Sequence, residues 1–235
     1  MAIYTTNIKS EDSIDAILSI ADSFGLKRIN KNYLANNNSI SKITCSDEVT
    51  KKNYIPYTNK AINWHTDGYY NDVKNQIKAV ILHCVKTAET GGENKLLDPE
   101  ILYIMLRDKN PDYIKALMSD NAILIPARLD KNNNIAREEI KGAIFSIDEN
   151  NKLYMRFTIR KKNIAFKDSS LINEALGYLN NILNSKSDYI FKLKLEPGMG
   201  LICNNVLHTR SAFIDSYDNT RLYYRARYLD RIANT

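Results

Sequence analysis

The chain contains three histidines, and one of them lies beside an aspartate in the segment Trp64-His65-Thr66-Asp67. If this segment is extended, His65 and Asp67 point to the same face, because side chains alternate along a strand. An imidazole beside a carboxylate is half of a metal site. Such a short motif also arises by chance, so the hypothesis needs a third ligand from elsewhere in the chain.

Two histidines remain as candidates for that third ligand. His83 lies within the apolar segment 80–85, and this position favours a histidine buried in the core. His208 follows a Pro-Gly turn and an apolar run in segment 196–213, so we expect it at the far end of a strand. Functional side chains collect at such ends. His208 is therefore the predicted partner of His65 and Asp67.

Two imidazoles and one carboxylate on one face of an ion leave open positions, as in non-haem Fe(II) sites that activate O2. A zinc hydrolase can use a similar set, so these ligands do not decide the metal. Arg221 and Arg225 follow His208 by 13 and 17 residues, on what is expected to be the next strand. Since guanidinium binds carboxylate in a bidentate manner, 2-oxoglutarate could chelate the metal and pair with Arg221. The alternative is that both arginines face solvent.

The elements that must position these residues are mostly short strands. Apolar and β-branched segments predict strands at 76–88, 121–129, 142–148, 152–159, 189–213 and 220–229, with a hairpin turn at 149–151. Helical spacing predicts helices at 10–25 (capped by Ser10 or Asp12), at 98–120 with a break at Pro111, and at 169–185. Residues 34–53 are expected to form a loop. This pattern indicates a β-rich α+β fold, a β-sandwich or jelly roll with flanking and inserted helices.

Composition indicates one globular domain. The 235 residues are 44% apolar and 26% charged, and no segment has the length or apolarity of a transmembrane helix. We expect no membrane partner and no secretory signal. The odd, scattered cysteines Cys45, Cys84 and Cys203 predict reduced thiols and a cytoplasmic location. The net charge of +6 is dispersed, which favours a solvated basic surface over a nucleic-acid site, although an anionic substrate or cosubstrate remains an alternative.

Four segments in order resemble the taurine dioxygenase-like branch of the Fe(II)/2-oxoglutarate-dependent oxygenases, which includes the gamma-butyrobetaine hydroxylases. They are WHTD (64–67), AVILHCVKTAETGGENKLLD (79–98), EPGMGLICNNVLHTRSAF (196–213) and RLYYRARY (221–228). The resemblance covers about residues 55–230. It implies a double-stranded β-helix, a cupin-like jelly roll, as the core. The expected organisation is a single domain, with residues 1–54 as an N-terminal helix and loop extension.

The resemblance also implies roles for individual residues. His65, Asp67 and His208 would bind iron, Arg221 would bind the distal carboxylate of 2-oxoglutarate, and Arg225 would lie near the chelating end. The expected reaction converts 2-oxoglutarate to succinate and CO2 and hydroxylates the substrate. Relatives that halogenate have a small residue in place of the aspartate, so Asp67 favours hydroxylation or desaturation.

One cosubstrate contact departs from the family pattern. Many relatives carry a threonine two positions after the Gly-Gly motif, whereas this chain has Asn94 there. An amide can donate the same hydrogen bond to 2-oxoglutarate. Asn94 is therefore the expected replacement.

A small molecule is the expected substrate: an amino acid, a betaine or another small carboxylate. Tyr69 and Tyr70 could hold a cationic head group through cation–π attraction, or they could pack on the sheet. Arg156 and Arg160 could alternate on a strand and face an acidic group, or lie on an exposed face. Arg210 could contact substrate or brace the loop after His208.

Three further hypotheses stay open from the sequence. The same iron site could desaturate or otherwise oxidise its substrate. The chain could also be a non-catalytic, cupin-like binding protein. An oxygenase acting on a nucleic acid or a protein side chain is suggested only by the +6 charge. A homo-oligomer is compatible with each of them.

Overall fold

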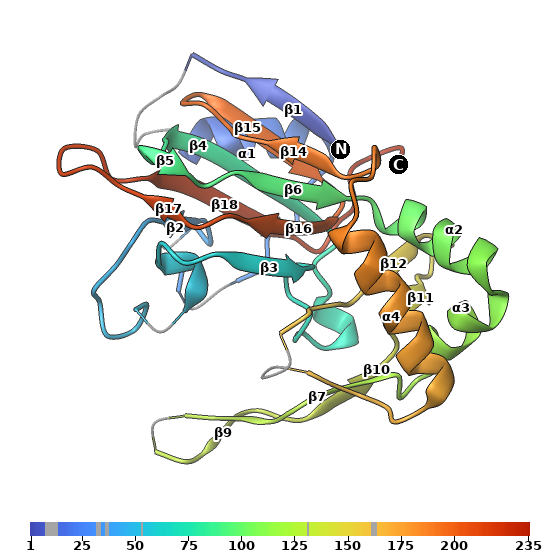
Figure 1. Ribbon diagram of the computed structural model, residues 1–235. Coiled ribbons are helices and arrows are strands. Elements are labelled where there is room, and N and C mark those ends of the chain that lie inside the picture. Colours follow the sequence, from blue (N-terminus) through green and yellow to red (C-terminus); the bar gives the residue numbers. More distant parts are fainter. Residues whose placement is uncertain (8–13, 32–33, 36–37, 53, 131, 161–163) are drawn as a thin grey trace.

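Two antiparallel sheets form the centre of the fold in the computed structural model (Figure 1), which describes residues 1–235 apart from 8–13, 32–33, 36–37, 53, 131 and 161–163. The larger sheet has the strand order β1-β15-β4-β18-β2, and the smaller one has the order β14-β6-β16-β3. The strands of the larger sheet are Ala2–Thr5, Met199–Cys203, Ala79–Lys86, Leu222–Tyr228 and Ser41–Ile43. Those of the smaller sheet are Phe191–Leu193, Asn94–Leu97, Leu207–Arg210 and Ile62–His65. These neighbours are far apart in sequence, as in the predicted jelly roll.

Shorter strands surround these two sheets. Three of these sets are antiparallel pairs: β5 (Thr90–Gly91) with β17 (Phe213–Ile214), β11 (Phe145–Ile147) with β12 (Leu153–Met155), and β8 (Arg128–Leu129) with β9 (Ile135–Arg137). The fourth is a three-stranded antiparallel sheet with the order β10 (Ile140–Gly142), β7 (Ile123–Ile125) and β13 (Ala165–Phe166). The β11–β12 pair confirms the predicted hairpin. The predicted strand 121–129 is interrupted at Pro126, and its end belongs to the β8–β9 hairpin, since proline donates no ladder hydrogen bond.

The helices confirm the predicted spacing. They are α1 (Ile14–Ser23), α2 (Pro99–Lys109), α3 (Pro111–Leu117) and α4 (Ser170–Asn184), with 3-10 turns η1 (Ile55–Tyr57) and η2 (Val73–Asn75). The break between α2 and α3 arises because Asn110 caps the second helix with its side chain and Pro111 begins it. The predicted cap of the first helix, Ser10 or Asp12, lies outside the described residues.

The N-terminal 54 residues contribute more than the expected helix and loop. β1 pairs with β15, and β2 pairs with β18, so both outer strands of the larger sheet come from this segment. The expected loop 34–53 therefore contains β2. Short polar segments of this kind become strands when a sheet edge is available, which local propensity does not reveal. The division of the chain at residue 54 stays a prediction.

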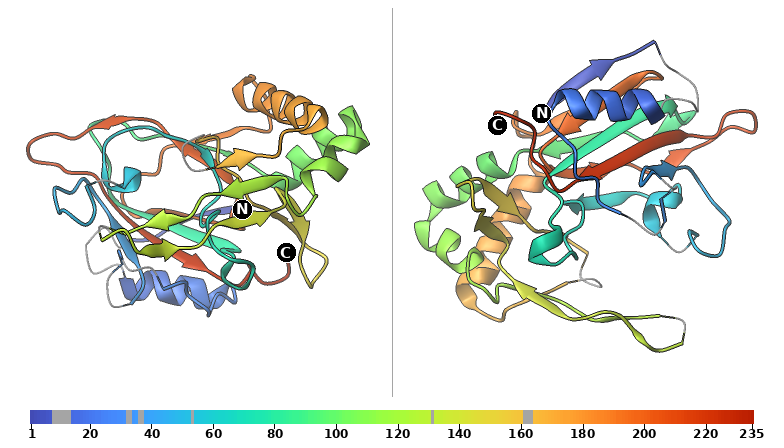
Figure 2. Two further views of the ribbon diagram at one scale, coloured as in Figure 1. Left: turned by 90° about the horizontal axis from the view of Figure 1, so that it is seen from below. Right: turned by 180° about the vertical axis from the view of Figure 1, so that it is seen from behind.

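Apolar side chains form three clusters around this frame. One cluster fills the space between the two central sheets and includes Val80, Leu96 and Leu201. A second joins α1 to the outer face of the larger sheet (Figure 2, right), with Ile17 and Ala21 at helical spacing. The third and largest packs α2, α3 and α4 against the shorter strands. Within the described part of the chain, no helix is both long and apolar enough to cross a membrane.

Candidate metal centre

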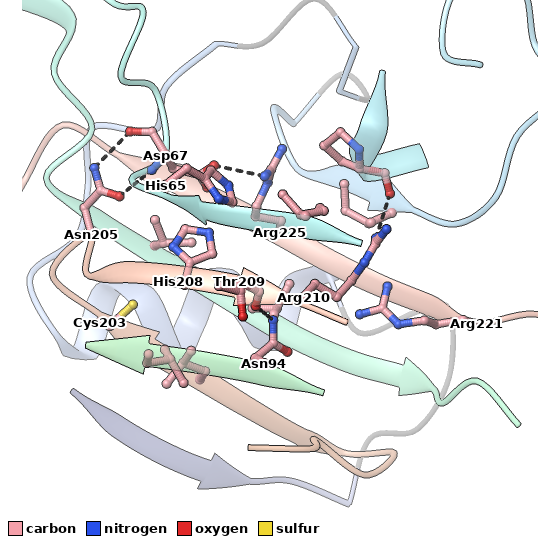
Figure 3. Close-up of a pocket in the computed structure, with 17 residues that line it drawn as sticks. His65, Asp67, Asn94, Cys203, Asn205, His208, Thr209, Arg210, Arg221 and Arg225 are labelled. Atoms are coloured by element: carbon pink, nitrogen blue, oxygen red, sulfur yellow. Dashed lines mark hydrogen bonds and ion pairs between the residues drawn. The ribbon is translucent and has the colours of Figure 1, made fainter. Parts of the chain in front are cut away.

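His65, Asp67 and His208 form one cluster, with potential ligand atoms that all lie within 4.8 Å of one another (Figure 3). Adjacent strands bring the two histidines together, because β16 pairs with β3 in the register that places His208 opposite His65. Their ring centroids are 4.2 Å apart. Asp67 lies two residues beyond the end of β3 and turns back toward both rings.

The structure corrects the predicted strand around His208. Segment 189–213 forms β14, β15 and β16, and His208 lies in the last of these, not at the end of the apolar strand that precedes it. The chain reverses between β15 and β16 at Asn205, which has a φ of 32°. Asparagine accepts a positive φ more readily than most residues. The turn thus delivers His208 to the second sheet, beside His65.

Both imidazoles present a lone pair toward the cluster. Nδ1 of His65 lies 2.8 Å from the carbonyl oxygen of Asn63, and Nδ1 of His208 lies 2.9 Å from that of Val206. Since a carbonyl only accepts hydrogen bonds, each Nδ1 carries the proton and each Nε2 is left as a metal ligand. Burial and the neighbouring His208 lower the pKa of His65 to about 3, so this imidazole is neutral at pH 7.

Asp67 supplies the negative charge of the cluster. Its side chain is buried, and its Oδ1 forms an ion pair with Nη1 of Arg225 at 3.1 Å. Oδ2 is also buried but has no hydrogen-bond partner. Burial alone would raise the pKa of this carboxyl, but Arg225 and Arg227 hold it well below its ordinary range. An ionised, unpartnered oxygen beside two Nε2 atoms fits a divalent cation.

A pocket extends from this cluster into the space between the sheets. Its walls are mainly apolar, and its far end is formed by Arg210 and Arg221 (Figure 3). Arg221 is only 2% exposed, and its guanidinium stacks 3.8 Å from the ring centroid of Tyr223 and 5.0 Å from that of Phe213. No carboxylate of the described residues forms an ion pair with it. A buried, unpaired guanidinium facing a metal cluster along a pocket suits a dicarboxylate that spans the two.

The family model for the taurine catabolism dioxygenases (TauD, TfdA family) matches residues 7–227. The chain belongs to this family. The resemblance seen in the four sequence segments is thus confirmed, together with Fe(II) and 2-oxoglutarate as the cofactor and cosubstrate of the family.

Individual members of the TauD/TfdA family show more distant similarity. The chain is 29% identical over 174 residues to a uridine-5'-phosphate dioxygenase of Amycolatopsis sp, a match that covers 71% of this chain and 60% of the relative. It is 25% identical over 170 residues to the gamma-butyrobetaine dioxygenase of Homo sapiens, covering 68% and 42%. The chain therefore spans less than two thirds of the length of these relatives.

Solved structures of related oxygenases share the fold. The asparagine oxygenase AsnO superposes with a TM-score of 0.64 at 15% identity, covering 96% of this chain and 67% of that one. The non-haem iron oxygenase OrfP, in complex with Fe and alpha-ketoglutaric acid, also has a TM-score of 0.64, at 14% identity, covering 91% and 63%. The predicted double-stranded β-helix is confirmed.

Seven of the predicted site residues of this family member line the pocket, whereas four do not. The lining set is His65, Asp67, Asn94, His208, Arg210, Arg221 and Arg225. The residues predicted to contact substrate, apart from Arg210, lie outside it: Tyr69, Tyr70, Arg156 and Arg160. His83 is buried beside Tyr4 and away from the metal cluster, which confirms it as a core histidine.

Two residues predicted to make contacts in the site have partners within the protein, and the contact of Asn94 with 2-oxoglutarate stays a prediction. Asn94 is buried in the pocket wall, and its amide donates to the carbonyl of Thr209 at 2.8 Å. Arg210 does not brace the loop after His208. Its guanidinium donates to the carbonyls of the segment that precedes β3, at Pro56, Thr58 and Lys60. Arg210 therefore holds in place the segment that leads into β3, the strand that carries His65.

Arg156 and Arg160 do not alternate on a strand. β12 ends at Met155, and the chain then leaves the hairpin to run beside β3, where Thr66 donates its backbone N–H to the carbonyl of Phe157. Arg156 is buried, and its Nη2 donates to the carbonyl of Asn71 at 3.1 Å, whereas Arg160 is half-buried. Arg156 is thus hydrogen-bonded to the turn that follows Asp67.

Asn205 is a residue of the site that the sequence did not single out. Its Oδ1 accepts from the backbone N–H of Asp67 at 2.8 Å, and its Nδ2 donates to the carbonyls of Asp67 and Ile77 at 2.9 and 2.6 Å. It lies three residues before His208, so one buried amide joins the two halves of the metal cluster. The doublet Asn204-Asn205 between two apolar runs signals a turn, but this signal does not identify the partner.

Replacing Asn205 by alanine is expected to destabilise the fold by about 2 to 4 kcal/mol, because three buried backbone groups lose their partner and the left-handed conformation is strained. Urea unfolding of the metal-free protein measures this change. Asn184→Ala is the matched control, since that amide is exposed at the end of α4 and should shift stability by only a few tenths of a kcal/mol. Equal midpoints for the two variants would contradict a linking role for Asn205.

Proposed function

We propose that this chain is an Fe(II)- and 2-oxoglutarate-dependent dioxygenase whose iron is held by His65, Asp67 and His208. The observation that carries the proposal is the convergence of two Nε2 lone pairs on the ionised, unpartnered Oδ2 of Asp67. These ligands occupy one face of an ion, and the open positions suit a chelating keto acid and dioxygen. When bound, the iron supplies dioxygen activation coupled to the conversion of 2-oxoglutarate to succinate and CO2.

Different residues of the pocket bind different parts of 2-oxoglutarate. Arg221 pairs with the distal carboxylate at the closed end, where the aromatic rings of Phe213 and Tyr223 hold its guanidinium in place. Arg225 lies at the metal end and keeps Asp67 ionised and oriented. Asn94 lines the wall between the two ends. The apolar walls exclude water, which strengthens each of these charged contacts.

Hydroxylation of a small molecule is the proposed outcome, within a single catalytic domain. Members with related sequences are named for uridine-5'-phosphate and gamma-butyrobetaine, so a nucleotide joins the expected amino acids, betaines and small carboxylates as a candidate substrate. Desaturation at the same iron site is the alternative, and analysis of the product separates the two. We propose neither a nucleic acid nor a membrane as a partner, and the cytoplasmic location stays a prediction.

The first experiment is an anaerobic visible spectrum of the metal-free protein, titrated with Fe(II) and then with 2-oxoglutarate. Iron chelated by the keto acid is expected to give a weak metal-to-ligand charge-transfer band in the wild type and in Asn184→Ala. His208→Ala is expected to lose the band, because only two protein ligands remain. A metal-loaded wild type without the band would favour a zinc site or a non-catalytic binding protein.

A further inference from the structure

We propose that the prime substrate carries an oxyanion, a carboxylate or a phosphate, and that Arg137 and Arg156 bind this group beside the turn Gly68–Asn71 that follows Asp67. This inference rests on the proposed function, which assigns the interior pocket to 2-oxoglutarate. The site proposed here is separate from that pocket, since neither arginine lines it.

The charge balance of the protein interior is the first reason. Among the described residues, the fully buried charged side chains are one carboxylate, Asp67, and four guanidiniums, those of Arg156, Arg210, Arg221 and Arg227. Arg225 is half-buried and pairs with Asp67, and the half-buried Asp215 lies near Arg210 and Arg221, so five guanidiniums share two carboxylates. The two positive charges of Fe(II) and the two negative charges of 2-oxoglutarate cancel. The loaded site therefore keeps an excess of positive charge, which favours an anionic substrate.

The position of these charges is the second reason. Three guanidiniums from separate segments each contact Tyr70 or Asn71 in the turn after Asp67. Arg137 of β9 lies 5.8 Å from the ring centroid of Tyr70, Arg227 of β18 donates to the hydroxyl of Tyr70 at 3.2 Å, and Arg156 donates to the carbonyl of Asn71 at 3.1 Å. This turn adjoins the metal ligand, so a group bound there holds the rest of the substrate near the iron.

The lack of counterions is the third reason. No carboxylate of the described residues forms an ion pair with Arg137, Arg156 or Arg227. Both carboxylate oxygens of the neighbouring Asp72 accept hydrogen bonds from Asn75. Nε of Arg137 is buried and has no hydrogen-bond partner. A guanidinium with an unused donor, on a turn that a buried guanidinium also contacts, is complementary to an oxyanion.

The same contacts disfavour a cationic head group at Tyr70. Arg137 already lies against the ring, and Arg227 occupies the hydroxyl. A quaternary ammonium there would meet two positive charges, and this repulsion outweighs a cation–π attraction of about 0.5 to 2 kcal/mol. The expectation that the tyrosine pair binds a cation is therefore replaced by an oxyanion bound beside it.

The test uses two small probes of opposite charge, methyl phosphate and tetramethylammonium, titrated by anaerobic calorimetry into protein loaded with Fe(II) and 2-oxoglutarate. Methyl phosphate is expected to bind and tetramethylammonium is not. Arg137→Gln should weaken the binding of methyl phosphate about tenfold or more, because a charged hydrogen bond is lost. Arg137→Lys should fall between the two. Arg107→Gln is the matched control, since Arg107 is exposed on α2 and, among the described residues, forms an ion pair with Asp108 alone.

Each outcome decides the inference. Failure of methyl phosphate to bind, equal binding by Arg137→Gln and wild type, or preferential binding of tetramethylammonium would overturn it. The charge-transfer band, recorded on the same samples, reports the proposed function independently. Protein that binds methyl phosphate through Arg137 but shows no band would keep the oxyanion site and lose the oxygenase. The reverse result would keep the oxygenase and lose the oxyanion site.

Discussion

Asp67→Ala is expected to lower the formation of succinate from 2-oxoglutarate by more than about 1000-fold, a rise of about 4 kcal/mol in the activation barrier. The substitution removes the only anionic ligand of the metal cluster and leaves two neutral imidazoles. It also leaves Arg225 without the carboxylate that it pairs with. Repulsion between that guanidinium and Fe(II) then adds to the loss of the ligand, so metal affinity and turnover fall together.

A second variant separates the loss of the negative charge from the loss of the side chain itself. Asp67→Asn keeps an oxygen that can accept from Arg225 and has almost the same volume, but it removes the charge. Its folded state should therefore resemble the wild type in thermal unfolding of the metal-free protein, while succinate formation remains at least about 100-fold reduced. Full activity in either variant, with metal content confirmed, would exclude Asp67 as an iron ligand.

Arg221→Gln is expected to raise the KM for 2-oxoglutarate by roughly 100-fold, which corresponds to about 2.7 kcal/mol. The guanidinium is buried at the end of the pocket without an ion-pair partner among the described residues, so its charge is available to a bound carboxylate. The effect should appear in KM far more than in kcat, because Arg221 lies at the opposite end of the pocket from the metal cluster.

Arg221→Lys is the informative companion. Lysine keeps the charge but lacks the planar group that stacks on Tyr223 and forms two parallel hydrogen bonds. We expect an intermediate KM, and added succinate should inhibit this variant less than the wild type. Steady-state assays with varied 2-oxoglutarate measure both effects. An unchanged KM in Arg221→Gln would mean that another residue, with Arg210 as the nearest candidate in the pocket, binds the distal carboxylate.

Most of the fold could be predicted because its strands carry their own local signals. β4 is a run of apolar and β-branched residues, and the α2–α3 boundary is marked by Pro111. The outer strands β1 and β2 were not predictable in this way. They have only four and three residues, and they become strands because the exposed edges of β15 and β18 offer unpaired backbone groups.

Residue chemistry in the sequence alone predicted the candidate metal ligands and the arginines. The chain has few histidines, Asp67 lies two residues after His65, and Arg221 follows His208 by 13 residues. These are properties of spacing in the sequence, and they do not depend on packing. The role of Asn205, by contrast, depends on a bond to Asp67, which lies 138 residues away. No local pattern encodes such a contact.

Only the tertiary structure decided what surrounds these ligands. The sequence shows Arg137, Arg156 and Arg227 as three unrelated basic residues, but the fold brings their guanidiniums to one turn, where no carboxylate of the described residues forms an ion pair with them. Charge balance is a property of the space around a site, because the energy of a buried charge depends on which groups lie near it and not on their order in the chain. The sequence therefore predicted the candidate reaction centre, and the fold supplied the arrangement of charge from which we infer an anionic substrate.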